Sequence, residues 1–173
     1  MDLEATVRSL EKRVGELEDR LAIYQLMFTY GPAADSGSAQ AAAHLWTADG
    51  VYDVGDTGKL TGHTELQNMY EGDGHQSLIK KGASHLTASP HVVINGDSAV
   101  ATCYSFVFAH EDGSYKVWRV SSNRWELVRE SGRWRIKRRS NRLLNGSAEA
   151  RALLAREIER LYDDLMKLDG APA

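Results

Sequence analysis

SSNRWELVRESGRWRIKRRS, residues 121–140, is the stretch of the chain that decides the fold. Ser131-Gly132 marks a tight turn between two runs in which apolar and polar residues alternate, the pattern of a β-hairpin. Two further turn signals, Asn-Gly at 95–96 and Asp-Gly at 112–113, lie upstream. Together these turns predict four antiparallel strands, at about 85–94, 98–109, 115–129 and 133–143.

Helical periodicity lies on both sides of this strand-rich segment. A long helix is expected from Leu3 to about Tyr30, interrupted by Gly31-Pro32, because proline lacks the backbone N–H that a helix interior requires. The other expected elements are helices at 39–46, 64–71 and 147–168, a strand at 51–54 and a mobile loop at 71–82. Helices around a strand meander predict one α+β domain over residues 1–173, with the helices packed on one face of a curved sheet.

Both terminal helices carry apolar stripes. In the C-terminal helix, capped by Ser147, the stripe is Leu154, Ile158, Leu161, Leu165 and Leu168. In the N-terminal extension, residues 1–21, a seam with alternating spacings of four and three residues is typical of a coiled coil: Leu3, Val7, Leu10, Val14, Leu17 and Leu21. This seam requires a partner helix, either the chain's own C-terminal helix or one of another subunit. We favour a homo-oligomer.

The composition is that of an ordinary globular protein. The 173 residues carry a net charge of -3, which gives no general attraction to nucleic acid or to anionic membranes. The single cysteine, Cys103, excludes an intrachain disulfide. The first residues are charged and no long apolar run occurs, which argues against a signal peptide and a membrane span. We expect a soluble, cytoplasmic protein with neither nucleic-acid nor membrane partners.

Strand alternation predicts which side chains face the interior. Ser121 and Asn123 fall on the inner face of their strand together with Trp125 and Leu127. Asn123 is then a buried amide, which either donates a hydrogen bond to a ligand or is satisfied within the core. In the last strand the residues expected to face solvent are Arg133, Arg135, Lys137 and Arg139. Arg138 would therefore point inward, where a charge needs an anion or a polar pocket.

Aromatic residues gather in the segments expected to enclose a pocket. They include Trp46, Tyr52, Tyr104, Phe106, Trp125 and Trp134. A mostly apolar pocket with a few polar groups suits a small hydrophobic ligand, such as a polycyclic or steroid-like ketone. The alternative is that these residues form core alone. The sequence has no metal-ligand spacing and no phosphate-binding glycine motif, so we expect neither a metal nor an organic cofactor.

Four stretches in this order resemble the SnoaL-like branch of the nuclear-transport-factor-2-like (NTF2-like) superfamily. They are LAIYQLMFTYGPAAD (21–35), HLWTADGVYDVG (44–55), GASHLTASPHVVINGDSAVA (82–101) and SSNRWELVRESGRWRIKRR (121–139). The resemblance covers about Leu21 to Leu144 and implies a cone-shaped, barrel-like α+β fold with a curved antiparallel sheet wrapped by the N-terminal helices. Family members include dehydratases, a dehydrochlorinase and polyketide cyclases, and they form dimers or trimers.

The resemblance also implies site residues. Dehydratases of this family use an aspartate after the first helix and a histidine opening the first meander strand, positions that match Asp35 and His85 here. Tyr30 is similar to a tyrosine of bile-acid dehydratase, and Asn123 and Ser121 match pocket residues of scytalone dehydratase. Tyr104 stands where scytalone dehydratase has a second histidine. This departure puts that enzyme's particular substrate in doubt for this chain. Tyr52, Tyr104, Ser121, Asn123, Trp46 and Arg138 are the expected substrate-binding residues.

An aspartate–histidine pair supports acid–base chemistry. Histidine exchanges protons near neutral pH, and a carboxylate on its other ring nitrogen fixes the tautomer and stabilises the imidazolium. Such a pair can remove a proton next to a carbonyl and return it to a leaving hydroxyl. Asp35 alone could instead bind backbone N–H groups at a helix end. We expect a cofactor-independent lyase of the dehydratase type; the alternatives are an isomerase or cyclase with the same base, or a non-catalytic ligand-binding module.

Overall fold

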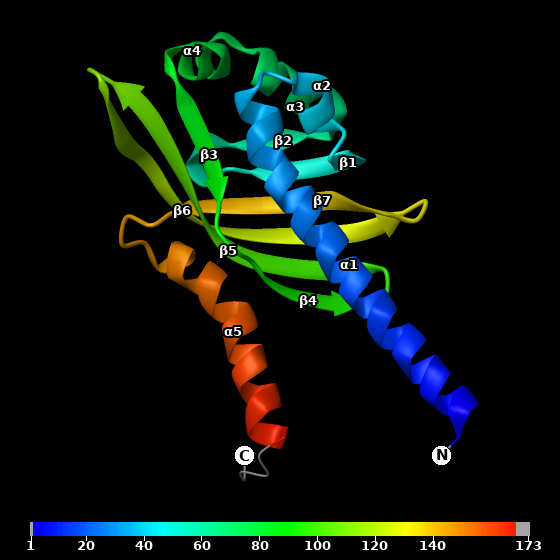
Figure 1. Cartoon of the computed structure of the whole chain (residues 1–173). Helices are drawn as coiled ribbons and strands as arrows, with labels where there is room; N and C mark the ends of the chain where they lie inside the picture. Colours follow the sequence, from blue (N-terminus) through cyan, green and yellow to red (C-terminus); the bar gives the residue numbers. More distant parts are fainter. Residues whose placement is uncertain (1, 169–173) are drawn as a thin grey trace.

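The computed structural model describes the backbone of residues 2–168, with the side chains of residues 2–159 and of Tyr162. Figure 1 shows its elements, which alternate between helices and strands in the first half and become a meander in the second. They are α1 (Leu3–Asp35), α2 (Ala39–Ala43), β1 (Trp46–Asp53), the 3-10 turn η1 (Gly55–Thr57), β2 (Lys59–Thr61), α3 (Gly62–Glu71), α4 (Asp73–Lys81), β3 (Ala83–Thr87), β4 (His91–Asn95), β5 (Ser98–Glu111), β6 (Ser114–Glu130), β7 (Arg133–Leu143) and α5 (Ala148–Leu168).

The strands form one curved sheet in the order β2-β1-β7-β6-β5-β3, with β4 also paired to β5. The sheet is open at both ends, so the barrel-like closure suggested by the resemblance is incomplete. Its pairings are antiparallel except for β1 with β7, which run parallel. The strand predicted at 85–94 is two strands, β3 and β4. Pro90 lies between them and cannot donate a ladder hydrogen bond.

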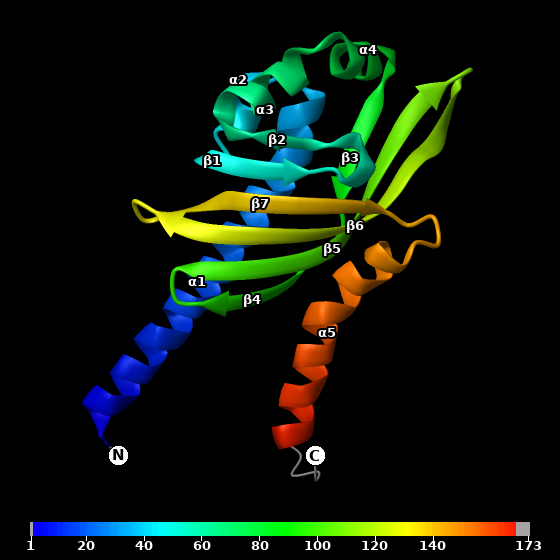
Figure 2. The same cartoon turned by 180° about the vertical axis from the view of Figure 1, so that it is seen from behind.

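The two long helices lie on opposite faces of the sheet, as the views from front and back show (Figures 1 and 2). On one face, α1 buries a stripe of Ile23, Met27, Tyr30 and Ala34. On the other, α5 packs against β6, where buried Glu157 lies 3.5 Å from Arg124. The expectation that all helices share one face is therefore wrong for α5. The sheet is long enough to pack a helix on each side.

Helix α1 continues through Pro32 and ends at Asp35, so the predicted interruption at Gly31-Pro32 is wrong. Pro32 falls in the last turn, where a lost N–H breaks only one helical hydrogen bond. The predicted mobile loop at 71–82 is also wrong, because α4 occupies most of it. Gly72 and Gly82 stand at the two ends of α4, and its charges, acidic at the start and basic in the last turn, favour a helix.

The remaining helix predictions are mixed. The helix expected at 39–46 stops at Ala43, and Trp46 already belongs to β1. Ser147 caps α5 by accepting a hydrogen bond from the backbone N–H of Ala150 at 3.3 Å. In the predicted stripe of α5, Leu154 is half-buried and Ile158 is exposed, while the side chains of Leu161, Leu165 and Leu168 lie outside the described residues. None of the helices in the described residues is long and apolar enough to cross a membrane.

Candidate active site

Asp35 and His85 are in direct contact. Asp35 is the last residue of α1, and His85 lies in the middle of β3. Asp35 Oδ1 lies 2.5 Å from His85 Nδ1, and Asp35 Oδ2 accepts a hydrogen bond from the His85 backbone N–H at 2.7 Å. Both oxygens of the carboxylate are therefore engaged by one residue, which fixes the imidazole against the end of α1.

A glycine allows this close approach of helix and strand. A Cβ built on Gly31 would lie 2.1 Å from the carbonyl oxygen of His85, far closer than real atoms approach. Any larger residue here would push β3 away from α1 and separate the pair. The Gly31-Pro32 signal, predicted to break the helix, thus marks the point where the helix touches the strand.

The contact determines the tautomer of His85. An ionised carboxylate can only accept hydrogen bonds, so the proton between the two residues belongs to Nδ1 of the imidazole. The other ring nitrogen, Nε2, forms no hydrogen bond with any described residue. In the neutral imidazole Nε2 therefore carries a free lone pair. This is the arrangement of a general base whose orientation is set by its carboxylate.

His85 lines a cavity of about 70 Å³ between α1 and the sheet. The other lining residues are Tyr30, Tyr52, Leu86, Thr87, Ser105, Phe106, Val107, Trp118, Arg119, Arg139 and Asn141. A second cavity of about 310 Å³ shares Arg119 and Asn141 with the first and extends to the start of α5. The walls of the first cavity combine aromatic rings with several polar groups, so the pocket is less apolar than the sequence suggested.

Two cations line this cavity, the half-buried Arg119 and the buried Arg139, which is only 4% exposed. The guanidinium carbon of Arg139 lies 4.4 Å from the ring centroids of both Tyr30 and Trp125 and 5.0 Å from that of Tyr52. Its Nε donates to Asn123 Oδ1 at 2.8 Å, whereas Nη1 is buried and has no hydrogen-bond partner among the described residues. No described carboxylate forms an ion pair with it. The positive charge of Arg139 is thus stabilised by three aromatic ring faces and by the side-chain amide of Asn123.

Asn123 is the centre of the hydrogen-bond network behind this cavity. Its amide donates to Ser105 Oγ at 2.7 Å, and its carbonyl also accepts from Asn141 Nδ2 at 3.0 Å. Asn141 Oδ1 in turn accepts from Arg119 Nη2 at 2.9 Å, and Arg119 Nε donates to Ser121 Oγ at 3.1 Å. Asn123 and Ser121 are completely buried and do not line the cavity. They position the side chains that do.

The prediction of an inward Arg138 is wrong. Ile136 pairs with Leu127, but the next pair along β7 is Arg138 with Glu126, so Lys137 is an extra residue in the ladder. This bulge reverses the alternation from that point onward. Arg139, expected to face solvent, is consequently buried. Arg138 is more than a third exposed and lies 3.8 Å from Asp53.

The predicted aromatic residues fall into three groups. Tyr30 and Tyr52 line the cavity, and burial raises the pKa of Tyr30 well above its ordinary value, so its hydroxyl keeps its proton. Trp46 is buried behind Tyr52, with ring centroids 5.7 Å apart, and belongs to the core. The prediction is wrong for Tyr104, which is half exposed. Its neighbour Cys103 takes the inward position on β5.

Sequence reasoning did not single out His75, which the structure places beside the pair. It lies on α4, its Nε2 is 2.9 Å from the carbonyl oxygen of Ala34, and its ring centroid is 5.7 Å from that of His85. Ala34 directly precedes Asp35 on α1, so this contact places α4 beside the Asp35–His85 pair. The one available signal was the acidic-to-basic charge order of this segment, which is typical of a helix. Within the described residues, no group of three or more potential metal ligands is assembled.

The profile of the SnoaL-like domain matches residues 15–140 of the chain. The chain therefore belongs to the SnoaL-like family, which includes dehydratases and isomerases, and it has the NTF2-like fold. The matched segment contains α1 from its middle, the Asp35–His85 pair and the sheet up to Arg139. A search of curated proteins gives no match.

Solved structures similar to this chain carry the same fold. An NTF2-like protein with a cystatin-like fold from Novosphingobium aromaticivorans is 42% identical, with a TM-score of 0.82, over 84% of this chain and 94% of that one. A protein of unknown function from Mycobacterium tuberculosis is 22% identical, with a TM-score of 0.68; the match covers 84% of this chain and 88% of that one. A protein provisionally named a scytalone dehydratase, also from Novosphingobium aromaticivorans, is 18% identical, with a TM-score of 0.64, over 74% and 85%.

Proposed function

We propose that this protein is a cofactor-independent lyase, a dehydratase that removes water from a β-hydroxy carbonyl compound. The observation that carries the proposal is His85. One of its ring nitrogens is fixed by Asp35, the other has no hydrogen-bond partner among the described residues, and His85 lines a cavity that the buried cation Arg139 also lines. A base and a cation that line the same small cavity suit the formation of an enolate.

The reaction needs only groups that the chain supplies. His85 Nε2 takes the proton from the carbon next to the carbonyl, and the electron pair of that C–H bond moves to the carbonyl oxygen. Arg139 and the protonated hydroxyl of Tyr30 stabilise the oxyanion so formed. The pair then returns to form the C=C bond as the β C–O bond breaks. The imidazolium, stabilised by Asp35, gives its proton to the leaving hydroxyl, which departs as water.

The cavities limit the substrate. The first cavity, about 70 Å³, is well below the roughly 300–1,000 Å³ of pockets that enclose a drug-sized ligand. A polycyclic or steroid-like ligand does not fit there in full. We propose that the reacting carbonyl and its neighbouring carbons occupy the first cavity, and that the rest of the substrate lies in the second, beyond Arg119 and Asn141.

The test uses a panel of cyclic and open-chain β-hydroxy ketones in heavy water. Deuterium entering the carbon next to the carbonyl, followed by NMR, reports the base step, and loss of one water molecule, followed by mass spectrometry, reports elimination. We expect both signals from the wild-type protein and neither from folded His85→Gln. Deuterium exchange without loss of water would favour isomerisation or cyclisation by the same base. Tight ligand binding with neither signal would favour a binding module and contradict the proposal.

A further inference from the structure

The first half of α1 extends beyond the sheet without packing on it. Residues 2–14 are all exposed. Figures 1 and 2 show the helix running past the edge of the sheet from front and back. Its first polar anchors to the sheet are Asp19, which binds Arg129, and Arg20, whose Nη1 donates to the Val92 carbonyl at 3.0 Å. A helical segment of this length is marginally stable in water when nothing packs against it.

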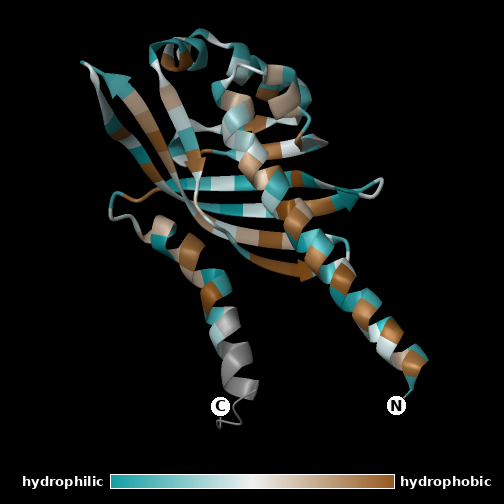
Figure 3. Cartoon of the chain, viewed as in Figure 1, coloured by the Kyte–Doolittle hydropathy of each residue, from teal (hydrophilic) through white to brown (hydrophobic). Residues whose placement is uncertain are grey.

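This extension carries a continuous apolar stripe, visible as brown patches along the projecting helix in Figure 3. The exposed fractions along it are 75% for Leu3, 44% for Val7, 50% for Leu10, 51% for Val14, 65% for Leu17 and 58% for Leu21. The stripe therefore has no cover within the described part of the chain. It is separate from the stripe of Ile23, Met27, Tyr30 and Ala34 that packs on the sheet.

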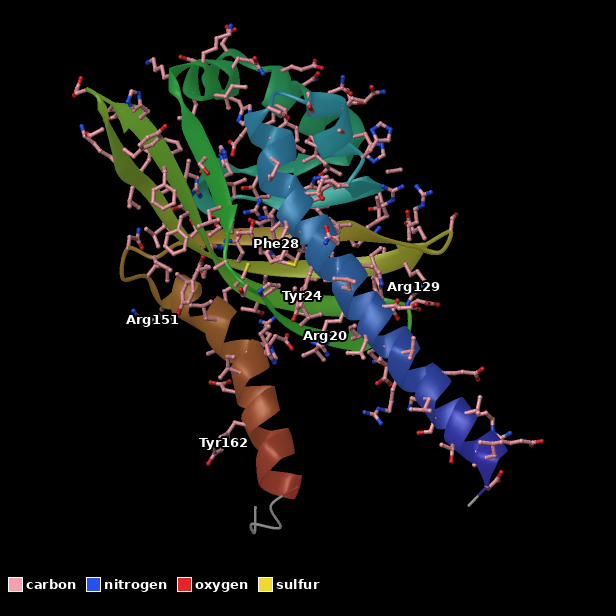
Figure 4. The ribbon with its side chains drawn as sticks, in the orientation of Figure 1. Arg20, Tyr24, Phe28, Arg129, Arg151 and Tyr162 are labelled. Atoms are coloured by element: carbon pink, nitrogen blue, oxygen red, sulfur yellow. The ribbon has the colours of Figure 1, made fainter. Side chains whose placement is uncertain are left out.

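The stripe does not stop where the helix reaches the sheet. Tyr24 and Phe28 continue the alternating spacing of three and four residues, and their ring centroids are 6.2 Å apart. Phe28 is 44% exposed. Figure 4 shows Arg20, Tyr24 and Phe28 on successive turns of α1. Tyr24 is partly buried against the core, whereas Phe28 and the six apolar residues from Leu3 to Leu21 are exposed and open to a partner.

The residue types along the stripe indicate how many helices it joins. In heptad notation Val7, Val14 and Leu21 occupy a positions, and Leu3, Leu10 and Leu17 occupy d positions. A β-branched residue at a with leucine at d favours two parallel helices over three or four.

The flanking charges also distinguish between orientations. The e positions are acidic, Glu4, Glu11 and Glu18, and two of the g positions are basic, Arg13 and Arg20. In a parallel pair each g position faces the following e position of the other helix, so Arg13 meets Glu18 of the second copy. In an antiparallel pair e would face e and g would face g, bringing like charges together. Arg13, Glu11 and Glu18 form no ion pair within the described residues.

We propose that residues 3–21 of α1 form a parallel two-stranded coiled coil with the same segment of a second copy of this chain. The apolar stripe is self-complementary in a pair of this symmetry, and so are the charges beside it. Both globular bodies then lie at the same end of the coiled coil. The inference does not depend on the catalytic proposal.

Sedimentation equilibrium of the full chain tests whether the dimer exists. We expect the wild-type protein to be a dimer and Leu10→Lys to be a monomer with an unchanged sheet signal in circular dichroism. Ser9→Lys is the matched control, since it places the same charge one residue away on the solvent side of the helix, and it should remain a dimer. A monomeric wild-type chain, or a dimer that survives Leu10→Lys, would overturn the proposal.

Charge reversal and cross-linking test the orientation. Arg13→Glu should weaken the dimer, and the double variant Arg13→Glu/Glu18→Arg should restore it, because the two reversed charges face each other only in the parallel pair. Oxidised Val7→Cys should form a covalent dimer, whereas wild-type Cys103 is buried and should not cross-link. No rescue by the double variant, together with no covalent dimer from Val7→Cys, would overturn the parallel arrangement.

Discussion

Two arginines of neighbouring strands, Arg129 on β6 and Arg139 on β7, have similar aromatic neighbours and very different electrostatic ones. Each guanidinium lies over a tryptophan ring, at 4.5 Å from Trp134 for Arg129 and at 4.4 Å from Trp125 for Arg139. Arg129 is about a quarter exposed and binds two carboxylates, those of Asp19 and Asp97. Arg139 is almost fully buried and has no described carboxylate partner.

The difference separates a cation that carboxylates of the chain neutralise from one that has no described counter-ion. Arg129 joins α1 to the sheet, and both of its charge partners come from the chain itself. Burying a cation without a counter-ion is costly, and such a group is expected to be retained where an anion arrives during function. The lack of a counter-ion for Arg139 therefore supports the proposal that its charge stabilises an oxyanion in the cavity that His85 also lines. The two arginines can serve as each other's control.

The largest expected effect is loss of turnover in Arg139→Met. Methionine has a similar length, so the variant should fold, and its melting temperature should equal or exceed that of the wild type because a buried uncompensated charge is removed. Turnover should fall by about 10²–10³-fold, the usual cost of removing an oxyanion donor. Steady-state kinetics and thermal melting measure the two effects. A variant with lowered stability and unchanged kcat would make Arg139 a structural residue.

Sequence alone could not identify Arg139 as the buried cation. In β6 the alternation of Ser121, Asn123, Trp125 and Leu127 with charged neighbours gives a clear phase, and all four are buried as predicted. In β7 the run Lys137-Arg138-Arg139 contains three cations in succession, so alternation carries no information there. The position of the bulge depends on how β7 pairs with β6. The sequence of β7 alone does not contain that information.

The Asp35–His85 contact was predictable for a different reason. The resemblance pointed to both residues, but only the structure shows what holds them together: α1 continues past Pro32, and Gly31 has no side chain at the His85 carbonyl. Residue types predict neither feature, because glycine next to proline more often ends a helix than marks the place where a helix packs closely on a strand. Long-range packing, not local propensity, decided this part of the site.

A smaller effect should follow from Gly31→Ala, which disturbs the dyad while leaving the neighbours of Arg139 in place. The added methyl would meet a backbone oxygen, which cannot move aside as a flexible side chain can. We expect β3 to shift and the protein to lose about 1–3 kcal/mol of stability, with turnover reduced because Asp35 no longer fixes the imidazole. Gly15→Ala is the control, since its Cβ would meet nothing within 4 Å. Equal melting temperatures for the two variants would contradict the packing argument.

Arg129→Met tests whether Arg129 is purely structural, because the variant should lower stability and leave activity unchanged. The variant loses a bidentate contact with Asp19, at 2.7 and 2.6 Å, and the stacking on Trp134. Since the pair is partly exposed, we expect a loss of about 1 kcal/mol in the free energy of unfolding. Urea denaturation measures that loss, and kcat for the same substrate should stay at the wild-type value. A fall in kcat comparable to that of Arg139→Met would remove the distinction drawn between the two cations.

The smallest expected effect is the pH dependence of that same contact. Hydrogen bonds from Arg129 hold the pKa of Asp19 below its ordinary value, against the opposing effect of burial. A carboxyl whose pKa is lowered on folding contributes stability above its unfolded pKa, about 4, and loses that contribution as the pH falls through the folded value. Asp19→Asn should therefore lower the melting temperature at pH 7, and the difference from wild type should shrink below about pH 4. In the Arg129→Met background Asp19→Asn should have little effect on the melting temperature at either pH, because the partner that lowers the pKa of Asp19 is gone. If Asp19→Asn lowers the melting temperature as much in that background as in the wild type, the stabilisation comes from Trp134, whose Nε1 also donates to Asp19, at 3.2 Å.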